Sequence, residues 1–206
     1  MSQKLISMET FVGAGGSYLG LKKAGFKTVY VNEIDKNFAK TLIHNNKKDL
    51  EDCLIDIKPI EEINFKDVRN KLNLKKKVVD LIFGGPVCKG YSLAGVRDPS
   101  DIRNTLYRHQ LRMISEFLPK ISIIENVPAM RTSLILKSGI EKNKLKEISY
   151  VWKQLDIFKG MKAKLTKEGK KLSKKEFADY NLIKNKKKNF EEFVKDNSIS
   201  VIDDIK

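Results

Sequence analysis

The sequence has few of the residues that hold small folds together: two cysteines, two histidines and one tryptophan among 206 residues. Cys53 and Cys88 are far apart and form no C-x-x-C pair, so we expect neither a disulfide framework nor a metal site. No apolar run approaches the roughly 20 residues that a membrane-spanning helix needs, and no signal peptide is recognisable. We therefore expect a cytoplasmic protein with no membrane contact.

Acidic residues are also scarce relative to basic ones, at 26 against 41, which gives a net charge of +15. A hydrophobic content of 41% excludes wholesale disorder, and the positive charge favours a polyanionic partner such as DNA. Residues 1–131 hold 22 basic and 15 acidic residues, whereas the shorter stretch 132–206 holds 19 and 11. The composition thus predicts an α/β domain over 1–131 and a Lys-rich C-terminal segment over 132–206.

Short apolar runs alternate with amphipathic stretches in the first part. Alternation of this kind is typical of an α/β fold with a doubly wound, mostly parallel sheet. The predicted strands are Lys4–Met8, Thr28–Asn32, Val78–Phe83 and Ile121–Ile124, with helices around Ser17–Ala24, Lys36–His44 and Leu106–Phe117. In the second part we predict one helix around Leu145–Phe158 and find only weak periodicity beyond it.

A glycine-rich turn follows the first predicted strand, in Thr10–Gly20 (TFVGAGGSYLG). Such turns let a ligand approach the backbone at a helix N-terminus, although a merely tight turn is an alternative. Tyr18 stands where a dinucleotide fingerprint has its third glycine, which argues against a nicotinamide-dependent oxidoreductase. Glu33, about 20 residues on, is placed to accept ribose hydroxyls. Asp56 is a weaker candidate acceptor for an adenine amino group.

Cys88 follows another predicted strand on a Gly-Gly-Pro turn (VDLIFGGPVCKGYS). Open α/β sheets bind ligands at the carboxyl ends of their strands, so the thiol is placed as a nucleophile, with a buried inert cysteine as the alternative. Lys89 beside it would favour the thiolate. Glu125 follows the next strand and would supply a carboxyl group to the same crevice.

Together these segments resemble the cytosine-C5 DNA methyltransferase family. Their order and spacing agree over about residues 5–130. The matching segments are Phe11–Gly16, Gly20-Leu21, Ala24–Phe26, Asn32–Asp35, Asp56-Ile57, Gly84–Gly95, Arg103–Tyr107, Pro119-Lys120 and Glu125–Val127.

The resemblance implies a Rossmann-like methyltransferase fold that binds S-adenosyl-L-methionine. Phe11 would stack on the adenine, Glu33 would hold the ribose, and Asp56 and Ile57 would border the adenine. The full set of implied cofactor-binding residues is Phe11, Gly13, Ala14, Gly15, Gly16, Glu33, Asp56, Ile57, Pro86 and Leu106.

The resemblance also implies the chemistry. Cys88 would add as thiolate to C6 of a cytosine flipped out of the DNA duplex, and Glu125 would hydrogen-bond the ring at N3 and the amino group. Arg103, Lys186 and Lys188 would contact DNA. RNA stays open as a substrate, because the cysteine chemistry does not identify the sugar.

The sequence departs from the family pattern in two places. Val87 and Lys89 replace the Pro and Gln that normally flank the nucleophile. After residue 131 only faint matches follow, in Ala178–Lys188 and Asn197–Val201, so the methyltransferase domain is expected to be C-terminally incomplete with no room for a target-recognition domain. We therefore expect a truncated or split catalytic subunit that uses a second chain for recognition. The alternative is a non-catalytic remnant that binds S-adenosyl-L-methionine or DNA.

Overall fold

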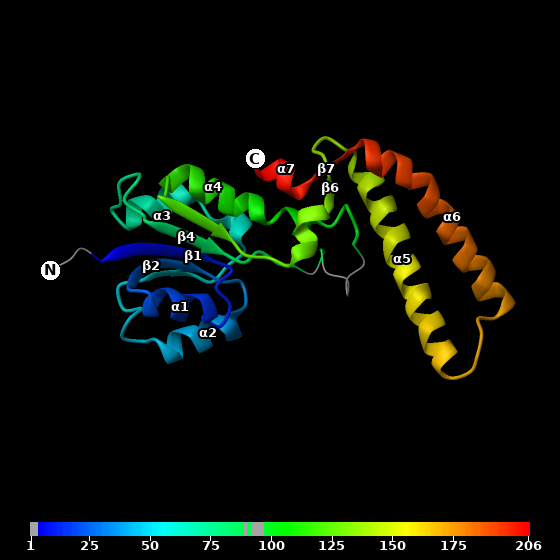
Figure 1. Cartoon of the computed structure of the whole chain (residues 1–206), viewed down its shortest axis with the longest axis horizontal. Helices are drawn as coiled ribbons and strands as arrows, with labels where there is room; N and C mark the ends of the chain where they lie inside the picture. Colours follow the sequence, from blue (N-terminus) through cyan, green and yellow to red (C-terminus); the bar gives the residue numbers. More distant parts are fainter. Residues whose placement is uncertain (1–3, 89, 92–96) are drawn as a thin grey trace. The chain divides into compact units, whose positions relative to one another are not determined.

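The computed structural model describes residues 4–88, 90–91 and 97–206, drawn in Figure 1. The chain forms two compact units. The sheet unit comprises Met1–Val87 and Leu106–Asn126, and the hairpin unit comprises Cys88–Thr105 and Val127–Lys206. This division differs from the boundary expected at residue 131, because residues 88–105 belong to the unit that holds the C-terminal part.

The sheet unit is built on five parallel strands in the order β3-β2-β1-β4-β5, as expected for a doubly wound sheet. The strands are β1 (Leu5–Thr10), β2 (Phe26–Asn32), β3 (Leu54–Asp56), β4 (Leu81–Gly84) and β5 (Ile121–Ile124). Their last residues are in register, since Thr10 pairs with Asn32 and Gly84, Asn32 with Asp56, and Gly84 with Ile124. The loops that follow all five strands therefore start from one edge of the sheet.

Helices cover both faces of this sheet. Neighbouring residues of a strand point to opposite faces, and Tyr30 packs in one apolar cluster with Phe117, while Val31 packs in another with Leu42. Capping fixes the start of the helix after β2, because the Asp35 carboxylate accepts from the backbone N–H groups of residues 37 and 38. The helices are α1 (Gly16–Lys23), α2 (Lys36–Asn45), α3 (Phe65–Lys71) and α4 (Tyr107–Phe117), with short 3-10 turns at Ile60–Glu62 and, in the other unit, Ile102–Thr105.

The hairpin unit contains two long antiparallel helices, α5 (Lys142–Lys167) and α6 (Lys174–Asp196), which lie side by side in Figure 1. The sequence predicted only the middle of α5 and missed α6. The unit also holds the 3-10 turn η3 (Pro128–Thr132), the antiparallel strands β6 (Leu134–Leu136) and β7 (Ser198–Ser200), and α7 (Val201–Ile205).

The core of the hairpin unit lies in one half of the hairpin. Its buried members are Leu136, Ile148, Val151, Trp152, Leu155, Ile183 and Val194, and it ends toward the turn at an edge-to-face contact between Phe158 and Tyr180. The segment Ala178–Lys188, which faintly matches a family motif, lies inside α6 as continuous helix. No helix in the described part of the chain is long and apolar enough to cross a bilayer.

Candidate active site

The glycine-rich turn connects β1 to α1 in a conformation that favours glycine. Gly13 has φ 57° and Gly15, which precedes the helix, has φ 98°. A Cβ on Gly15 would lie 2.5 Å from Leu42 Cδ1, so this glycine lets the turn approach the Leu42 side chain of α2 closely. A Cβ on Gly13 would enter open space, so the backbone there is free for a ligand to approach.

Glu33 holds this turn against the end of β2. One carboxylate oxygen accepts from Gly13 N–H at 2.7 Å and the other from Asp35 N–H at 2.8 Å. The side chain is only 8% exposed. A carboxylate has about four acceptor positions, so two remain for other donors such as ribose hydroxyls. The structure thus adds a positioning role for Glu33 that sequence spacing did not show.

Asp56 closes β3 beside Glu33. Its backbone oxygen accepts from Glu33 N–H, and its carboxylate accepts from the Tyr30 hydroxyl at 3.1 Å. Burial and the Asp56 charge raise the pKa of Tyr30, so that hydroxyl stays a donor. Ile57, the next residue, is exposed, so it is available to border a ligand.

Phe11 follows β1 with φ 55°, and its ring packs partly on the main apolar cluster of the sheet unit, as does Leu106. Ala14 lies in the glycine turn and Gly16 begins α1. These residues thus all belong to the sheet unit.

Hydrogen bonds join the chain at the end of β4 to the chain at the end of β5. Glu125 N–H donates to Gly84 O, and the Asn126 side-chain amide donates to Pro86 O at 2.7 Å. A Cβ on Gly85 would lie 3.2 Å from a Glu125 carboxylate oxygen, so the missing side chain leaves room for that carboxylate. Glu125 is exposed and Pro86 is buried. The turn before Cys88 is therefore anchored, and the carboxylate next to it is accessible.

The two cysteines have opposite environments. Cys88 is exposed, and its carbonyl oxygen accepts from Tyr91 N–H in a turn. Cys53 is half-buried, and burial followed by the charge of Glu9 raises its pKa to about 12. Cys88 is thus the more accessible of the two thiols. Lys89 and the motif residues 92–96 lie outside the described residues.

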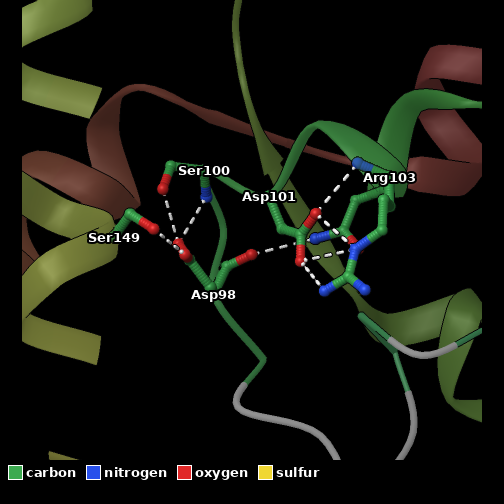
Figure 2. A network of polar contacts seen from close by, with 6 residues as sticks. Asp98, Ser100, Asp101, Arg103 and Ser149 are labelled. Carbon is green, nitrogen blue, oxygen red and sulfur yellow. Dashed lines mark hydrogen bonds and ion pairs between the residues drawn. The ribbon is translucent and has the colours of Figure 1, made fainter. Parts of the chain in front are cut away.

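A polar network holds residues 97–104 within the hairpin unit (Figure 2). Asp98 accepts from Ser100 N–H and hydroxyl with one carboxylate oxygen, and from the Ser149 hydroxyl on α5 at 2.6 Å with the other. The Asn104 amide donates to Asp98 O, and the buried Tyr91 hydroxyl donates to Asn104 O. The segment is therefore tied to helix α5, which no sequence motif indicated.

The predicted DNA contacts lie in the hairpin unit but are not equivalent. Arg103 pairs with Asp101 through two guanidinium nitrogens at 2.6–3.1 Å, as Figure 2 shows, and this pairing holds the pKa of Asp101 below its usual range. Lys186 lines a hollow on the hairpin with Glu147 and Tyr150. Lys188 is exposed on α6. These three side chains line no common pocket among those described.

Sequence reasoning missed one buried acid in the sheet unit. Glu9, on β1, is 0% exposed, and burial raises its pKa to about 7 against hydrogen bonds from Ser17 and Thr28 that lower it. The signal was an acidic residue inside an apolar strand.

Comparison with known proteins decides the family. The family model for the C-5 cytosine-specific DNA methylases matches residues 5–158. The chain belongs to this family. The match contains every predicted cofactor-binding residue together with Cys88 and Glu125, and it ends within α5.

Individual methylase relatives agree. The Type II methyltransferase M.PspPI of Psychrobacter sp. (strain TA137) is 34% identical over 175 residues, which cover 80% of this chain and 38% of that protein. M.AgeI of Thalassovita gelatinovora is 35% identical, covering 59% of this chain and 27% of that protein. For M.AquIA of Picosynechococcus sp. (strain ATCC 27264 / PCC 7002 / PR-6) the identity is 36%, covering 63% and 50%. The chain thus spans between about a quarter and a half of these curated relatives.

A solved structure supports the fold. A crystal structure assigned to a DNA modification methyltransferase of an Escherichia coli prophage is 27% identical, with a TM-score of 0.50, over 70% of this chain and 37% of that one. The sheet order and this similarity establish the Rossmann-like fold of S-adenosylmethionine-dependent methyltransferases.

Proposed function

We propose that this chain is the catalytic part of a DNA cytosine-C5 methyltransferase and that Cys88 is its nucleophile. The observation that supports this most directly is the contrast between the two thiols. Cys88 is exposed after β4, whereas Cys53 is half-buried with a pKa raised to about 12. Membership of the C-5 cytosine-specific family requires one reactive cysteine, and Cys88 is the better placed of the two.

The edge of the sheet fits S-adenosyl-L-methionine. The open backbone at Gly13, the free acceptor positions of Glu33 and the exposed side chain of Ile57 suit an adenosine group. Phe11, Asp56, Pro86 and Leu106, together with the glycine turn, would complete the pocket. When bound, this cofactor supplies the methyl group that replaces the proton on C5 of cytosine.

The residues of the chain activate the base. The Cys88 thiolate forms a bond to C6, and the electron pair displaced toward C5 makes that carbon nucleophilic. Glu125 hydrogen-bonds N3 and the amino group, which stabilises the charge that addition places on the ring. Solvent water takes the proton from C5, the electron pair of that C–H bond restores the C5–C6 double bond, and Cys88 leaves C6 as a thiolate, which releases the 5-substituted base.

Target recognition is proposed to come from outside these 206 residues, through a second chain. Arg103, Lys186 and Lys188 would add contacts to phosphates rather than to bases. Asp101 fixes the Arg103 guanidinium through Nε and Nη2, and the remaining N–H groups would be the ones that reach a phosphate.

Covalent trapping tests the nucleophile. DNA containing 5-fluorocytosine should form a stable adduct with the chain and its partner, because fluorine cannot leave C5 as a proton does. Cys88→Ser should abolish the adduct, and Cys53→Ser is the matched control that should retain it. Intact-mass measurement shows which variant forms the adduct. An adduct that forms with Cys88→Ser but not with Cys53→Ser would overturn the assignment.

The alternative is a non-catalytic protein that binds the cofactor or DNA. The specific observation in its favour is Val87, which lacks the fixed φ of the proline usual at that position. Calorimetric titration with S-adenosyl-L-methionine separates the cases, since binding without adduct formation would support the alternative. Glu33→Ala should weaken cofactor binding by roughly 1.5–3 kcal/mol, because a charged acceptor is lost.

A further inference from the structure

The turn end of the α5–α6 hairpin carries a concentrated positive charge. We call residues 159–175 the tip; they hold eight lysines and one acidic residue, Glu168. All eight lysines are exposed, and no residue of the tip is buried. The tip begins at the residue after the family match ends. It thus contributes little to the core and lies outside the matched methylase segment.

The charge of the tip is largely uncompensated. Lys170 pairs with Glu168 at 3.1 Å, and within the described part of the chain no other lysine of the tip has an ion pair. The other half of the hairpin differs, because Lys187 pairs with Glu191 and lies 5.0 Å from the ring of Trp152. Lys187 thus has both a carboxylate and an aromatic partner, whereas the aromatic contact of the tip joins Lys162 to the Tyr180 ring at 5.9 Å and neutralises no charge.

Four of these lysines converge on one hollow. A pocket of about 350 Å³ is lined by Lys162 of α5, Lys170 and Lys171 of the turn, and Lys174 of α6. Thr166, Leu172 and Phe177 complete its lining, and no carboxylate contributes. The lining atoms of the hollow are mainly apolar, so the lysines contribute their carbon stems to it. Four like charges carried by neighbouring segments raise the local positive potential, which attracts a polyanion.

We propose that the tip binds the phosphodiester backbone of duplex DNA. This rests on the proposed function, which supplies DNA as the substrate, and it assigns the non-specific contact to one place. Exposed lysines give point charges without the bidentate geometry that fixes a small phosphate ligand, so a polymer that contacts several of them at once is the better fit. Such binding releases counterions and is insensitive to sequence. It would hold DNA near the chain while recognition is supplied elsewhere.

Two charge-matched variants of the full chain test the assignment. The tip variant carries Lys162→Gln, Lys170→Gln, Lys171→Gln and Lys174→Gln. The control carries Lys23→Gln, Lys40→Gln, Lys47→Gln and Lys48→Gln, which are exposed lysines of the sheet unit. Both variants have the same net charge, so a difference between them reports on position. Circular dichroism checks that both remain folded.

The readout is the salt dependence of binding to a labelled DNA duplex, measured by fluorescence anisotropy. In the tip variant, the magnitude of the slope of log affinity against log salt concentration should fall by about 3–4, because each lost phosphate contact removes roughly 0.9. In the control variant it should fall by less than about one. Equal changes in slope would show that the positive charge of the whole chain attracts DNA and would overturn the proposal.

Displacement of the duplex by poly-glutamate as readily as by unlabelled DNA would instead indicate an acidic protein partner. An RNA duplex that binds about tenfold tighter than DNA would overturn the choice of polymer. These binding measurements do not depend on the Cys88 thiol. Failure to form the covalent adduct and failure of the tip assignment are therefore separate results.

Discussion

The carboxyl end of the sheet in the sheet unit and the tip of the hairpin unit use polar residues in different ways. At the sheet edge, Glu33, Asp56 and Asn126 each bond to a defined backbone atom or hydroxyl, so each group has a fixed position. At the tip of the hairpin, eight lysines share one acidic neighbour. Fixed groups suit chemistry at one atom of a ligand, whereas interchangeable charges suit attraction to a polymer. Under the proposed function, the carboxyl end of the sheet would hold the cofactor and the tip would hold DNA.

The largest expected effect tests whether the two units are also separate in stability. Phe117 in the sheet unit and Ile148 in the hairpin unit are both fully buried. We expect Phe117→Ala to cost about 3–5 kcal/mol and Ile148→Ala about 2–5 kcal/mol, through lost burial and the cavities left behind. In urea unfolding, Trp152 fluorescence reports on the hairpin unit alone, because it is the one tryptophan in the sequence. The urea midpoint of the Trp152 fluorescence transition should fall more in Ile148→Ala than in Phe117→Ala. Equal falls in both variants would mean that the two units unfold as one cooperative unit.

Glu9 should make the sheet unit depend on pH in a direction unusual for a carboxylate. Its pKa is about 7 in the folded state and about 4.5 when unfolded, so the folded state binds the extra proton between these values. Stability attributable to Glu9 is therefore present below pH 4.5 and is lost as pH rises to 7, by roughly 3 kcal/mol in total.

Glu9→Gln should remove this loss, which is checked by urea unfolding of both proteins at pH 5 and pH 8. The lowered pKa values of Asp80 and Glu116 act in the opposite sense at lower pH, so the difference between the two proteins is the quantity to measure. A constant difference across this range would contradict the assigned burial effect.

Ser149→Ala sharpens the comparison from the hairpin side. It removes the hydroxyl that donates to buried Asp98 at 2.6 Å. We expect a loss of about 1.5–3 kcal/mol, because the bond has a charged acceptor. Ser149→Thr keeps a hydroxyl and is the control. The loss should be seen in the Trp152 signal, and its absence there would argue that the network in Figure 2 does not stabilise this unit.

The smallest effect concerns the start of α6. Ser173 caps this helix and shares a capping box with Glu176. Ser173→Ala should cost about 1 kcal/mol, whereas Ser173→Asp should retain the cap. Circular dichroism during thermal unfolding measures both, and identical melting of Ser173→Ala and the unchanged chain would show that the box contributes little.

Local sequence determined much of the sheet unit. Alternation of apolar runs with amphipathic stretches predicted the parallel sheet, because strand and helix periods are short-range properties. The strand Ile121–Ile124 was placed correctly, while Val78–Phe83 began three residues too early. Helix α6 was missed because charged residues on several of its faces obscure the period. The S-x-x-E pattern at Ser173 was the available signal.

The tertiary structure alone decided how these elements hold their functional groups. Sequence spacing placed Glu33 near a ribose, but the chain path brings it onto Gly13 N–H, 20 residues away. Sequence singled out Cys88 and Glu125, while the folded chain assigns them to different compact units and shows that Cys53 is the less exposed thiol. Burial and hydrogen bonding depend on contacts between segments that are far apart in the sequence, and short-range patterns do not specify those contacts. For the same reason, only the fold shows that lysines from α5, the turn and α6 line one pocket.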